Sequence, residues 1–502
     1  MPEPTLSRPP RYGGGRERSP GGSVKPNVLL VTLDQFRGDW TGAAGHPVVR
    51  TPNLDQLAAQ GVRFARHYSQ AAPCGPGRAS LYTGTYQMNH RVVGNGTPLD
   101  HRFDNVALAA RRAGYEPALF GYTDSAVDPR VVDDGDPRLQ TYEGILPGFD
   151  PVLPLVGDQR PWRRWLDDLG HDVPHSTAAL LESESQRSAD VSISAFLTDQ
   201  AIDWIHRRDA PWFAHLSYLR PHPPYAAAGR FAEMYDPADM DPPIPPAEGR
   251  HPFHDRLMRV PDLMAPTDAD AGRRLRAHYA GMISEVDHQL GRLWTFLRDA
   301  SQWDRTVVVI TSDHGEQLGD HGYVQKAGFF EQSYHIPAIV RDPAATAGHG
   351  TTIEMFTENV DVFPTLCDVM GIDVPAQCDG LPLTPFLRGE EPPWWRSAAH
   401  WEYDWRTSFI GSGDHQWPWD RRLERQHLAV RRDATAAYVQ FGDGSWRCFD
   451  LAADPTWRTE LHDPAAVLPH AQAMLQWRSV HADRTLADTL IEHGVQGRDP
   501  RH

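Results

Sequence analysis

The sequence predicts an α/β protein in which a mixed, mostly parallel sheet lies between layers of helices, followed by a smaller α+β subdomain. Short apolar segments alternate with amphipathic helical segments over residues 27–390, and this alternation is typical of a parallel sheet covered on both faces. A Gly-Glu-Glu-Pro-Pro sequence at residues 389–393 interrupts the pattern, and three short strand-like segments follow it. A chain of 502 residues is long enough for one large core and a second, smaller one.

The composition argues against several classes of protein. Hydrophobic residues make up 40% of the chain and charged residues 23%, which indicates a globular protein rather than a disordered one. The net charge of −17 argues against a nucleic-acid-binding protein, and no apolar run is long enough to span a membrane. Residues 1–26 read as a flexible polar tail without the apolar stretch of a secretory signal. Because the chain also has just four cysteines, we expect a cytoplasmic protein.

The first unit, residues 27–390, is the predicted catalytic domain. It opens with a nearly continuous apolar run at residues 27–33, as expected of a strand buried on both faces. Residues 53–60 are predicted to form a short helix that Gly61 caps. Residues 268–298 carry apolar side chains at three- and four-residue steps, which predicts a long amphipathic helix. Further strands are predicted at residues 117–121, 212–219, 306–312 and 337–341.

The second unit, residues 391–502, is predicted to contain a small antiparallel sheet, a helix and an oligomerisation tail. Asp443 and Gly444 are typical of a hairpin turn between two of its strands. The helix is expected to begin with Asp463 as its N-cap and Pro464 in its first turn. The predicted strands are residues 428–432, 436–441 and 446–450, and the helix covers residues 463–480.

Two predicted strands end at polar pairs that are able to bind a metal ion. Asp34 and Gln35 come directly after the first strand, and a later strand leads into Asp313 and His314. Because ligands bind beyond the carboxyl ends of parallel strands, both pairs are expected at one edge of the sheet. Their oxygen and nitrogen donors suit a divalent cation such as Ca²⁺, Mn²⁺ or Mg²⁺. For either aspartate alone, capping of the following helix is the simpler interpretation.

A third segment favours the metal site over helix capping. Cys74 opens the sequence Cys-Gly-Pro-Gly-Arg-Ala-Ser-Leu-Tyr-Thr-Gly; by itself, the cysteine would be interpreted as a buried structural thiol. In full, the segment resembles the sulfatase signature, in which the cysteine is oxidised to Cα-formylglycine. Further segments resemble the bacterial phosphonate monoester hydrolases, which are sulfatase relatives in the alkaline phosphatase superfamily. These segments are residues 87–91, 121–123, 220–224, 311–321 and 479–486.

The resemblance implies an alkaline phosphatase-like fold and a metal- and formylglycine-dependent hydrolase. It implies that one divalent ion is held by the two polar pairs and by one oxygen of the formylglycine made from Cys74. The pairing of Gln35 with His314 is the one seen in phosphonate hydrolases, whereas ordinary sulfatases tend to have Asp and often Asn at these positions. A neutral ligand leaves the metal more Lewis-acidic than a third carboxylate would. The implied metal ligands are Asp34, Gln35, Cys74, Asp313 and His314.

The resemblance also implies which residues surround the substrate. Arg78 lies one turn after the nucleophile and would hold its oxygen. Lys326 is one of two lysines in a chain with 47 arginines, which by itself favours a site that needs a compact point charge; an ordinary surface cation is the alternative. The residues that match positions around the substrate anion are Asn95, Tyr122, His222 and Lys326.

Asp124 departs from the family, in which threonine stands at the matching position. A carboxylate facing the substrate would repel a doubly charged anion more than a singly charged one. The effect is expected to be modest, because the site is expected to be open to water and solvent then screens the charge. It would vanish if Asp124 pointed away or paired with a neighbour such as Arg130.

These observations predict a hydrolase of phosphonate monoesters and phosphodiesters, with activity on sulfate esters as well. A dedicated arylsulfatase is the alternative, and a non-catalytic binding protein with the same fold is a more remote one. The expected partners are a small anionic ester, a formylglycine-generating enzyme and further copies of the chain in a homodimer or homotetramer. The aromatic-rich residues 400–419 are expected to cover the active site, lie in a subunit interface or pack in a core.

Overall fold

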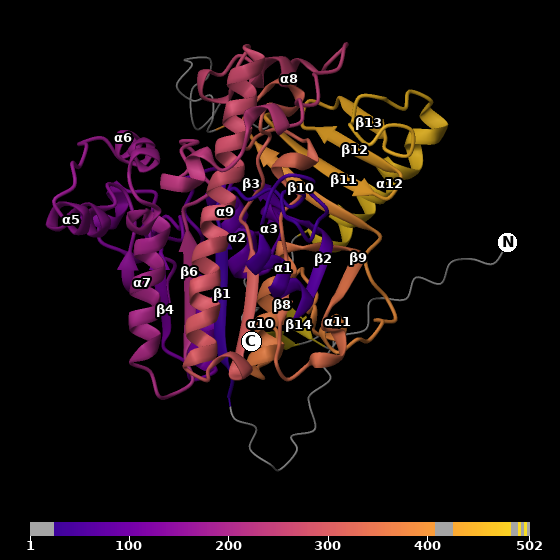
Figure 1. The fold of residues 1–502 in the computed structure, drawn as a ribbon. Helices are drawn as coiled ribbons and strands as arrows, with labels where there is room; N and C mark the ends of the chain where they lie inside the picture. The colour runs from indigo at the N-terminus through magenta and orange to yellow at the C-terminus, as the bar shows by residue number, and fades with distance from the viewer. Residues whose placement is uncertain (1–24, 407–424, 483–489, 493–495, 499–502) are drawn as a thin grey trace.

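A computed structural model of the protein describes residues 25–406, 425–482, 490–492 and 496–498 (Figure 1). Its central feature is a sheet of eight strands, which run parallel to their neighbours except for β8. The predicted mixed, mostly parallel sheet is therefore confirmed. The strands lie in the order β5 (Asp150–Pro154), β4 (Pro117–Gly121), β6 (Phe213–Tyr218), β1 (Asn27–Leu33), β7 (Thr306–Thr311), β8 (Ile339–Arg341), β2 (Val62–Tyr68) and β9 (Thr351–Glu358).

Helices cover both faces of this sheet because its central strands are apolar on both sides. Every residue of β1 and β7 is buried. Leu29 and Val31 face a core that includes α1, α7 and α9, whereas Val28 and Leu30 face a core that includes α2, α4 and α10. Figure 1 shows α9 lying along one face of the sheet, in front of β6 and β1. The helices are α1 (Pro52–Ala59), α2 (Cys74–Thr83), α3 (Gln87–His90), α4 (Val106–Arg112), α5 (Arg160–Asp168), α6 (Thr177–Glu182), α7 (Ile193–His206), α8 (Pro252–Leu257), α9 (Ala269–Asp299), α10 (Val362–Met370), α11 (Thr384–Leu387) and α12 (Pro464–His481).

A second sheet of five strands lies beside the first, with α12 packed on it (Figure 1). Four of its strands are antiparallel to one another, and β3, from the segment before Cys74, adds in parallel to β10. Trp401 on β10 is fully buried and stacks on Tyr68 and Tyr334. Residues 400–404 therefore pack in a core, whereas residues 407–419 of the same aromatic stretch lie outside the described residues. The order is β13 (Trp446–Asp450), β12 (Ala436–Phe441), β11 (His427–Asp433), β10 (Ala398–Asp404) and β3 (Ala71–Ala72); β14 (Leu490–Glu492) and β15 (Gln496–Arg498) form a separate pair.

All the predicted strands and the three predicted helices are present, with one error in capping. Gly61 does not cap α1, because Gln60 occupies the C-cap position. A β-carbon at Gly61 would instead lie 2.6 Å from the Val340 carbonyl oxygen, so the glycine is needed where the chain passes close to β8. The strands β2, β3, β5, β9, β10, β14 and β15 were not predicted. Among the described residues, no helix combines the length and apolar character needed to cross a membrane.

Candidate active site

Four neighbouring parallel strands end at the candidate site. The strands β4, β6, β1 and β7 lie side by side and point the same way. Tyr122 follows β4, the loop with His222 follows β6, Asp34 follows β1 and Asp313 comes soon after β7. The order of the strands therefore brings together side chains that lie up to 279 positions apart in the sequence, as expected at the carboxyl edge of such a sheet.

The predicted metal-binding pairs and the predicted nucleophile form one buried cluster. One potential ligand atom from each of four residues lies within 4.8 Å of the others. The Cys74 sulfur lies 3.2 Å from Nε2 of His314, and the Gln35 backbone N–H donates to Oδ1 of Asp313 at 3.2 Å. The four residues are Asp34, Cys74, Asp313 and His314, and all four are buried.

The donor atoms in this cluster fit a divalent cation. Oδ1 of Asp34 is buried and receives no hydrogen bond from any described residue, which is costly for a carboxylate oxygen unless a cation binds it. Nδ1 of His314 is 3.1 Å from the Gly315 carbonyl oxygen; donating its proton there leaves Nε2 available as a ligand. Carboxylate oxygens with one imidazole are a donor set suited to Ca²⁺, Mn²⁺ or Mg²⁺.

Cys74 lies in an environment that keeps its thiol protonated. It is the first residue of α2, and just 5% of its surface is exposed. Burial, followed by the charge of Asp34, raises the pKa of the Cys74 thiol well above its ordinary value. Asn95, another predicted substrate-binding residue, accepts a hydrogen bond from the Gly75 N–H at 2.9 Å and so fixes the first turn of α2. An unmodified cysteine in this position would be a poor nucleophile.

Arg78 joins the two aspartates of the cluster and is completely buried. Its Nε donates to Asp313 Oδ2 at 3.0 Å, and one terminal nitrogen donates to Asp34 Oδ2 at 3.1 Å. The other terminal nitrogen donates to Ser217 Oγ at 2.8 Å and to the Tyr122 carbonyl oxygen at 3.2 Å. The Tyr122 hydroxyl in turn donates to Asp34 Oδ2 at 2.5 Å. Arg78 and Tyr122 thus orient the acidic groups of the cluster.

Lys326, His222 and Gln35 form a connected chain at the edge of the cluster. The Lys326 ammonium donates to Gln35 Oε1 at 2.6 Å and lies 2.9 Å from Nε2 of His222. Nδ1 of His222 is 2.7 Å from the Pro223 carbonyl oxygen. Burial and the nearby Lys326 lower the pKa of His222 to about 3, so the ring is neutral and Nε2 accepts the lysine proton. Burial lowers the pKa of Lys326, but nearby negative charges, including those of Asp34 and Asp313, raise it overall.

Asp124 lies beside Arg78 and not beside Arg130. Its Oδ2 is 3.8 Å from Nε of Arg78, whereas Arg130 pairs with Asp128 at 2.6 Å and Asp100 at 3.0 Å. The expectation of strong solvent screening is wrong, because just 7% of Asp124 is exposed. Burial, with further repulsion from the two buried aspartates, raises the pKa of Asp124 to about 7 although Arg78 opposes the shift.

Three residues that support the site were not identified from the sequence. Ser217 contacts Arg78, and Glu316 accepts hydrogen bonds from Gln35 and from Tyr225. Glu316 follows the Asp-His-Gly sequence directly, so its position beside a predicted ligand pair was a usable signal. Ser217 and Tyr225 carry no such signal, because the fold alone brings them near the cluster.

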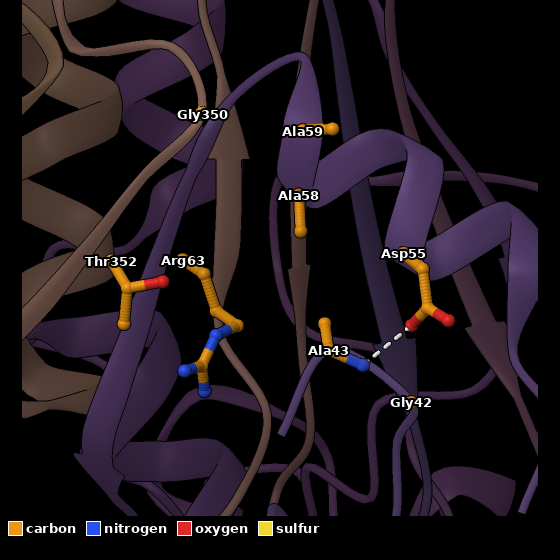
Figure 2. Close-up of a pocket in the computed structure, with 8 residues that line it drawn as sticks. All are labelled: Gly42, Ala43, Asp55, Ala58, Ala59, Arg63, Gly350 and Thr352. Carbon is orange, nitrogen blue, oxygen red and sulfur yellow. Dashed lines mark hydrogen bonds between the residues drawn. The ribbon is translucent and has the colours of Figure 1, made fainter. Parts of the chain in front are cut away.

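A surface hollow of about 320 Å³ lies elsewhere on the molecule, and none of these residues contributes to it. Figure 2 shows the residues that line it. Arg63 from β2 and Asp55 from α1 lie on opposite sides of it. Asp55 also accepts a hydrogen bond from the Ala43 N–H at 2.7 Å, drawn as a dashed line in Figure 2. The hollow is therefore separate from the buried cluster. Its lining consists of Gly42, Ala43, Asp55, Ala58, Ala59, Arg63, Gly350 and Thr352.

Two family models match the chain. The model described as sulfatase covers residues 26–372. The model described as N-sulphoglucosamine sulphohydrolase, C-terminal, covers residues 319–477. Together these matches include the whole cluster described above and all five strands of the second sheet.

Solved structures and curated proteins show the same relationship over nearly the full chain. The phosphonate monoester hydrolase of Agrobacterium radiobacter superposes with a TM-score of 0.85 at 42% identity, covering 95% of this chain and 100% of that one. The phosphonate monoester hydrolase of Silicibacter pomeroyi superposes with a TM-score of 0.82 at 36% identity, covering 95% of this chain and 99% of that one. The multifunctional alkaline phosphatase superfamily protein PehA of Trinickia caryophylli is 37% identical over 95% of this chain and 100% of its own length. An arylsulfatase of Clostridium perfringens is 27% identical over 87% of this chain and 90% of its own length.

Proposed function

The chain belongs to the sulfatase family of the alkaline phosphatase superfamily, and from this premise we propose that it hydrolyses phosphonate monoesters and phosphodiesters with a formylglycine at position 74. As a member of this family it is an ester hydrolase. The observation that carries the proposal is the buried cluster of Cys74, two aspartates and His314 at the carboxyl ends of β1 and β7. The cluster favours an enzyme over a non-catalytic binding protein.

The environment of Cys74 supports its conversion to formylglycine. Burial and nearby carboxylates keep the thiol protonated, and a cysteine adduct with sulfur or phosphorus would have no internal route to release its product. A hydrated aldehyde supplies one hydroxyl oxygen to attack the ester and displace the alcohol, and a second hydroxyl whose loss of a proton re-forms the aldehyde and expels the anion. A formylglycine-generating enzyme would carry out the modification.

The residues around the cluster support a single divalent ion, Ca²⁺, Mn²⁺ or Mg²⁺. Asp34, Asp313, His314 and Gln35 would hold it together with an oxygen of the modified Cys74, in keeping with the unpaired Asp34 oxygen. Such an ion supplies positive charge that makes a nearby hydroxyl more acidic and stabilises developing negative charge. Arg78 offsets one of the two negative charges of Asp34 and Asp313 and fixes the orientation of both carboxylates through its hydrogen bonds.

The remaining site residues are proposed to bind and orient the substrate anion. Lys326 is a half-buried cation that contacts Gln35 of the cluster, and its hydrogen bond to neutral His222 holds its ammonium in place. Tyr122 fixes Asp34, and Asn95 fixes the start of α2, so both control where the nucleophile lies. Preorganised charges of this kind stabilise the transition state of the transfer.

Phosphonate monoesters and phosphodiesters are favoured over sulfate esters as the principal substrates. Two structural relatives named phosphonate monoester hydrolase are 42% and 36% identical, whereas the arylsulfatase relative is 27% identical. The neutral Gln35 beside His314 is the pairing expected of the former group. Because sulfate monoesters and phosphodiesters each carry one negative charge, sulfate ester hydrolysis at the same site is also proposed. A dedicated arylsulfatase is the second candidate.

Parallel steady-state kinetics on an aryl phosphonate monoester, an aryl phosphodiester and an aryl sulfate test this proposal. We expect turnover of all three, with the highest kcat/KM for the phosphonate or the diester. Cys74→Ala should reduce all three activities together, since one nucleophile serves them all. Efficient sulfate hydrolysis without phosphonate or diester hydrolysis would replace this proposal with the dedicated arylsulfatase.

A further inference from the structure

Glu316 is a buried acid whose two oxygens face different partners. Its side chain is fully buried. Oε1 accepts hydrogen bonds from the backbone N–H groups of Leu318 at 2.8 Å and Gln325 at 2.5 Å. Oε2 accepts one from the Tyr225 hydroxyl at 2.8 Å and another from the Gln35 side-chain nitrogen. Four donors around one carboxyl group leave no position for a proton, so the group is a carboxylate.

We propose that Glu316 is a positioning residue that decides which atom of the Gln35 amide faces the metal centre, an inference that rests on the proposed metal site. The two ends of a glutamine amide are nearly equal in size, so hydrogen bonds and not packing determine its orientation. Because Oε2 of Glu316 only accepts, it binds Nε2 of Gln35. Oε1 of Gln35 then points to the opposite side, where it lies 2.6 Å from the Lys326 ammonium.

The same contact also changes the electron density of the ligand. A carboxylate that accepts from the amide N–H polarises the amide and makes its oxygen a stronger acceptor. Glu316 thus strengthens Gln35 as a ligand while its own charge stays behind the amide, where both of its oxygens are already occupied. The metal site gains part of the benefit of an anionic ligand without a third carboxylate in contact with the ion.

Glu316→Gln tests this assignment because the backbone donors cannot turn. The N–H groups of Leu318 and Gln325 require an oxygen, so the new amide must direct its nitrogen toward Gln35. Two NH₂ groups would then face each other, and Gln35 would turn over to present its own NH₂ to Lys326 and the metal site. We expect the affinity for Mn²⁺ to fall at least about tenfold, as is typical when a group that orients a metal ligand is removed.

A second substitution should reverse this loss. In the double variant Gln35→Glu/Glu316→Gln, the amide at position 316 donates to the carboxylate at position 35. The other oxygen of that carboxylate again faces the metal site. We expect Mn²⁺ affinity at or above that of the unsubstituted protein. Gln35→Glu alone places two carboxylates against each other, so its melting temperature should be lower than that of the double variant.

The measurement is calorimetric titration of the full-length, chelator-treated protein with Mn²⁺ alone, together with circular dichroism and thermal melting of each variant. Tyr225→Phe is the matched control, since it removes one donor to Glu316 and leaves the Gln35 contact unchanged; its affinity should stay within about threefold of the original. A merely structural role for Glu316 would not predict recovery when the hydrogen bond is reversed.

Asp313→Asn separates failure of this inference from failure of the metal centre. If Asp313→Asn lowers Mn²⁺ affinity and Glu316→Gln does not, the metal centre stands and the role of Glu316 is refuted. If neither variant changes affinity, the proposed metal site is wrong and this inference falls with it. Should Glu316→Gln fail to fold, the comparison of Gln35→Glu with the double variant decides: equal affinity and equal melting temperature would overturn the assignment.

Discussion

The buried Asp124 carboxyl should make the stability of the metal-free protein depend on pH in a predictable direction. Its pKa rises from 3.8 to about 7 because the group is buried beside Asp34 and Asp313. The folded-state pKa is the higher one, so the stability held by protonated Asp124 is complete below pH 3.8 and is lost as the pH rises through 7. A pKa shift of this size corresponds to a change of about 4 kcal/mol in the free energy of unfolding.

Asp124→Asn removes this titration while nearly preserving the shape of the side chain. Relative to the unsubstituted protein, the variant should gain stability progressively between pH 4 and pH 8, approaching about 4 kcal/mol above pH 7. Thermal melting after chelation across this range measures the gain as a difference in melting temperature. Chelation is needed because a bound cation would lower the pKa of Asp124.

Asp128→Asn is the matched control, because the pKa of Asp128 is shifted in the opposite direction. The hydrogen bond from Arg130 holds the pKa of Asp128 below its ordinary value, so this group stabilises the fold above that ordinary value and loses its contribution as the pH falls. Asp128→Asn should therefore melt lower at neutral pH and converge with the unsubstituted protein in acid. A pH-independent difference for Asp124→Asn would refute the assignment of a raised pKa to Asp124.

Four further predictions concern the chemistry and assembly of the protein. Peptide mass spectrometry across residues 72–78 should show an aldehyde in place of the Cys74 thiol, and an unmodified peptide in fully active enzyme would exclude the proposed nucleophile. Chelation should abolish activity, and Asp34→Asn should lower metal content because it removes an anionic ligand; unchanged content and rate would contradict the site. Asp124→Thr should raise kcat/KM for a dianionic phosphate monoester more than for a phosphodiester or sulfate. The difference in activation free energy between the two classes of substrate should be about 3 kcal/mol if a unit charge acts over roughly 6 Å. Equal changes would show that Asp124 does not act on the substrate charge. Light scattering at micromolar concentration should show a dimer or tetramer, and a monomer would refute the predicted assembly.

The sequence predicted the central strands well because their burial leaves a simple signal. β1 and β7 each contain an uninterrupted apolar run, at residues 28–31 and 307–310, as expected of a strand buried on both faces. β5 and β9 carry exposed polar positions at the sheet edge, so nothing in their local pattern separated them from loops. β10 is almost fully buried and rich in aromatic residues, but aromatic residues also suit an interface or an active-site cover.

The candidate site could be predicted as far as its members are tied to strand ends or to short motifs. Asp34 and Asp313 were predictable because each directly follows a buried strand, and the strand order then brings them together. The partners of Arg78 could not be predicted, because Ser217 and Tyr122 reach it through other strands of the sheet. The burial of Asp124 also depends on packing that no local pattern records.

The charges gathered at the cluster account for the proposed preference among anions. Asp34, Asp313 and Glu316 contribute three negative charges, and Arg78 and Lys326 contribute two positive ones. Without a cation this group of side chains would repel any anion, whereas a divalent ion would leave it with one net positive charge. One such charge matches a phosphonate monoester, a phosphodiester or a sulfate ester, each of which carries one negative charge, better than a dianionic phosphate monoester. Ionisation of Asp124, whose carboxyl lies 3.8 Å from Arg78, would cancel the remaining positive charge and so weaken the attraction for any anion.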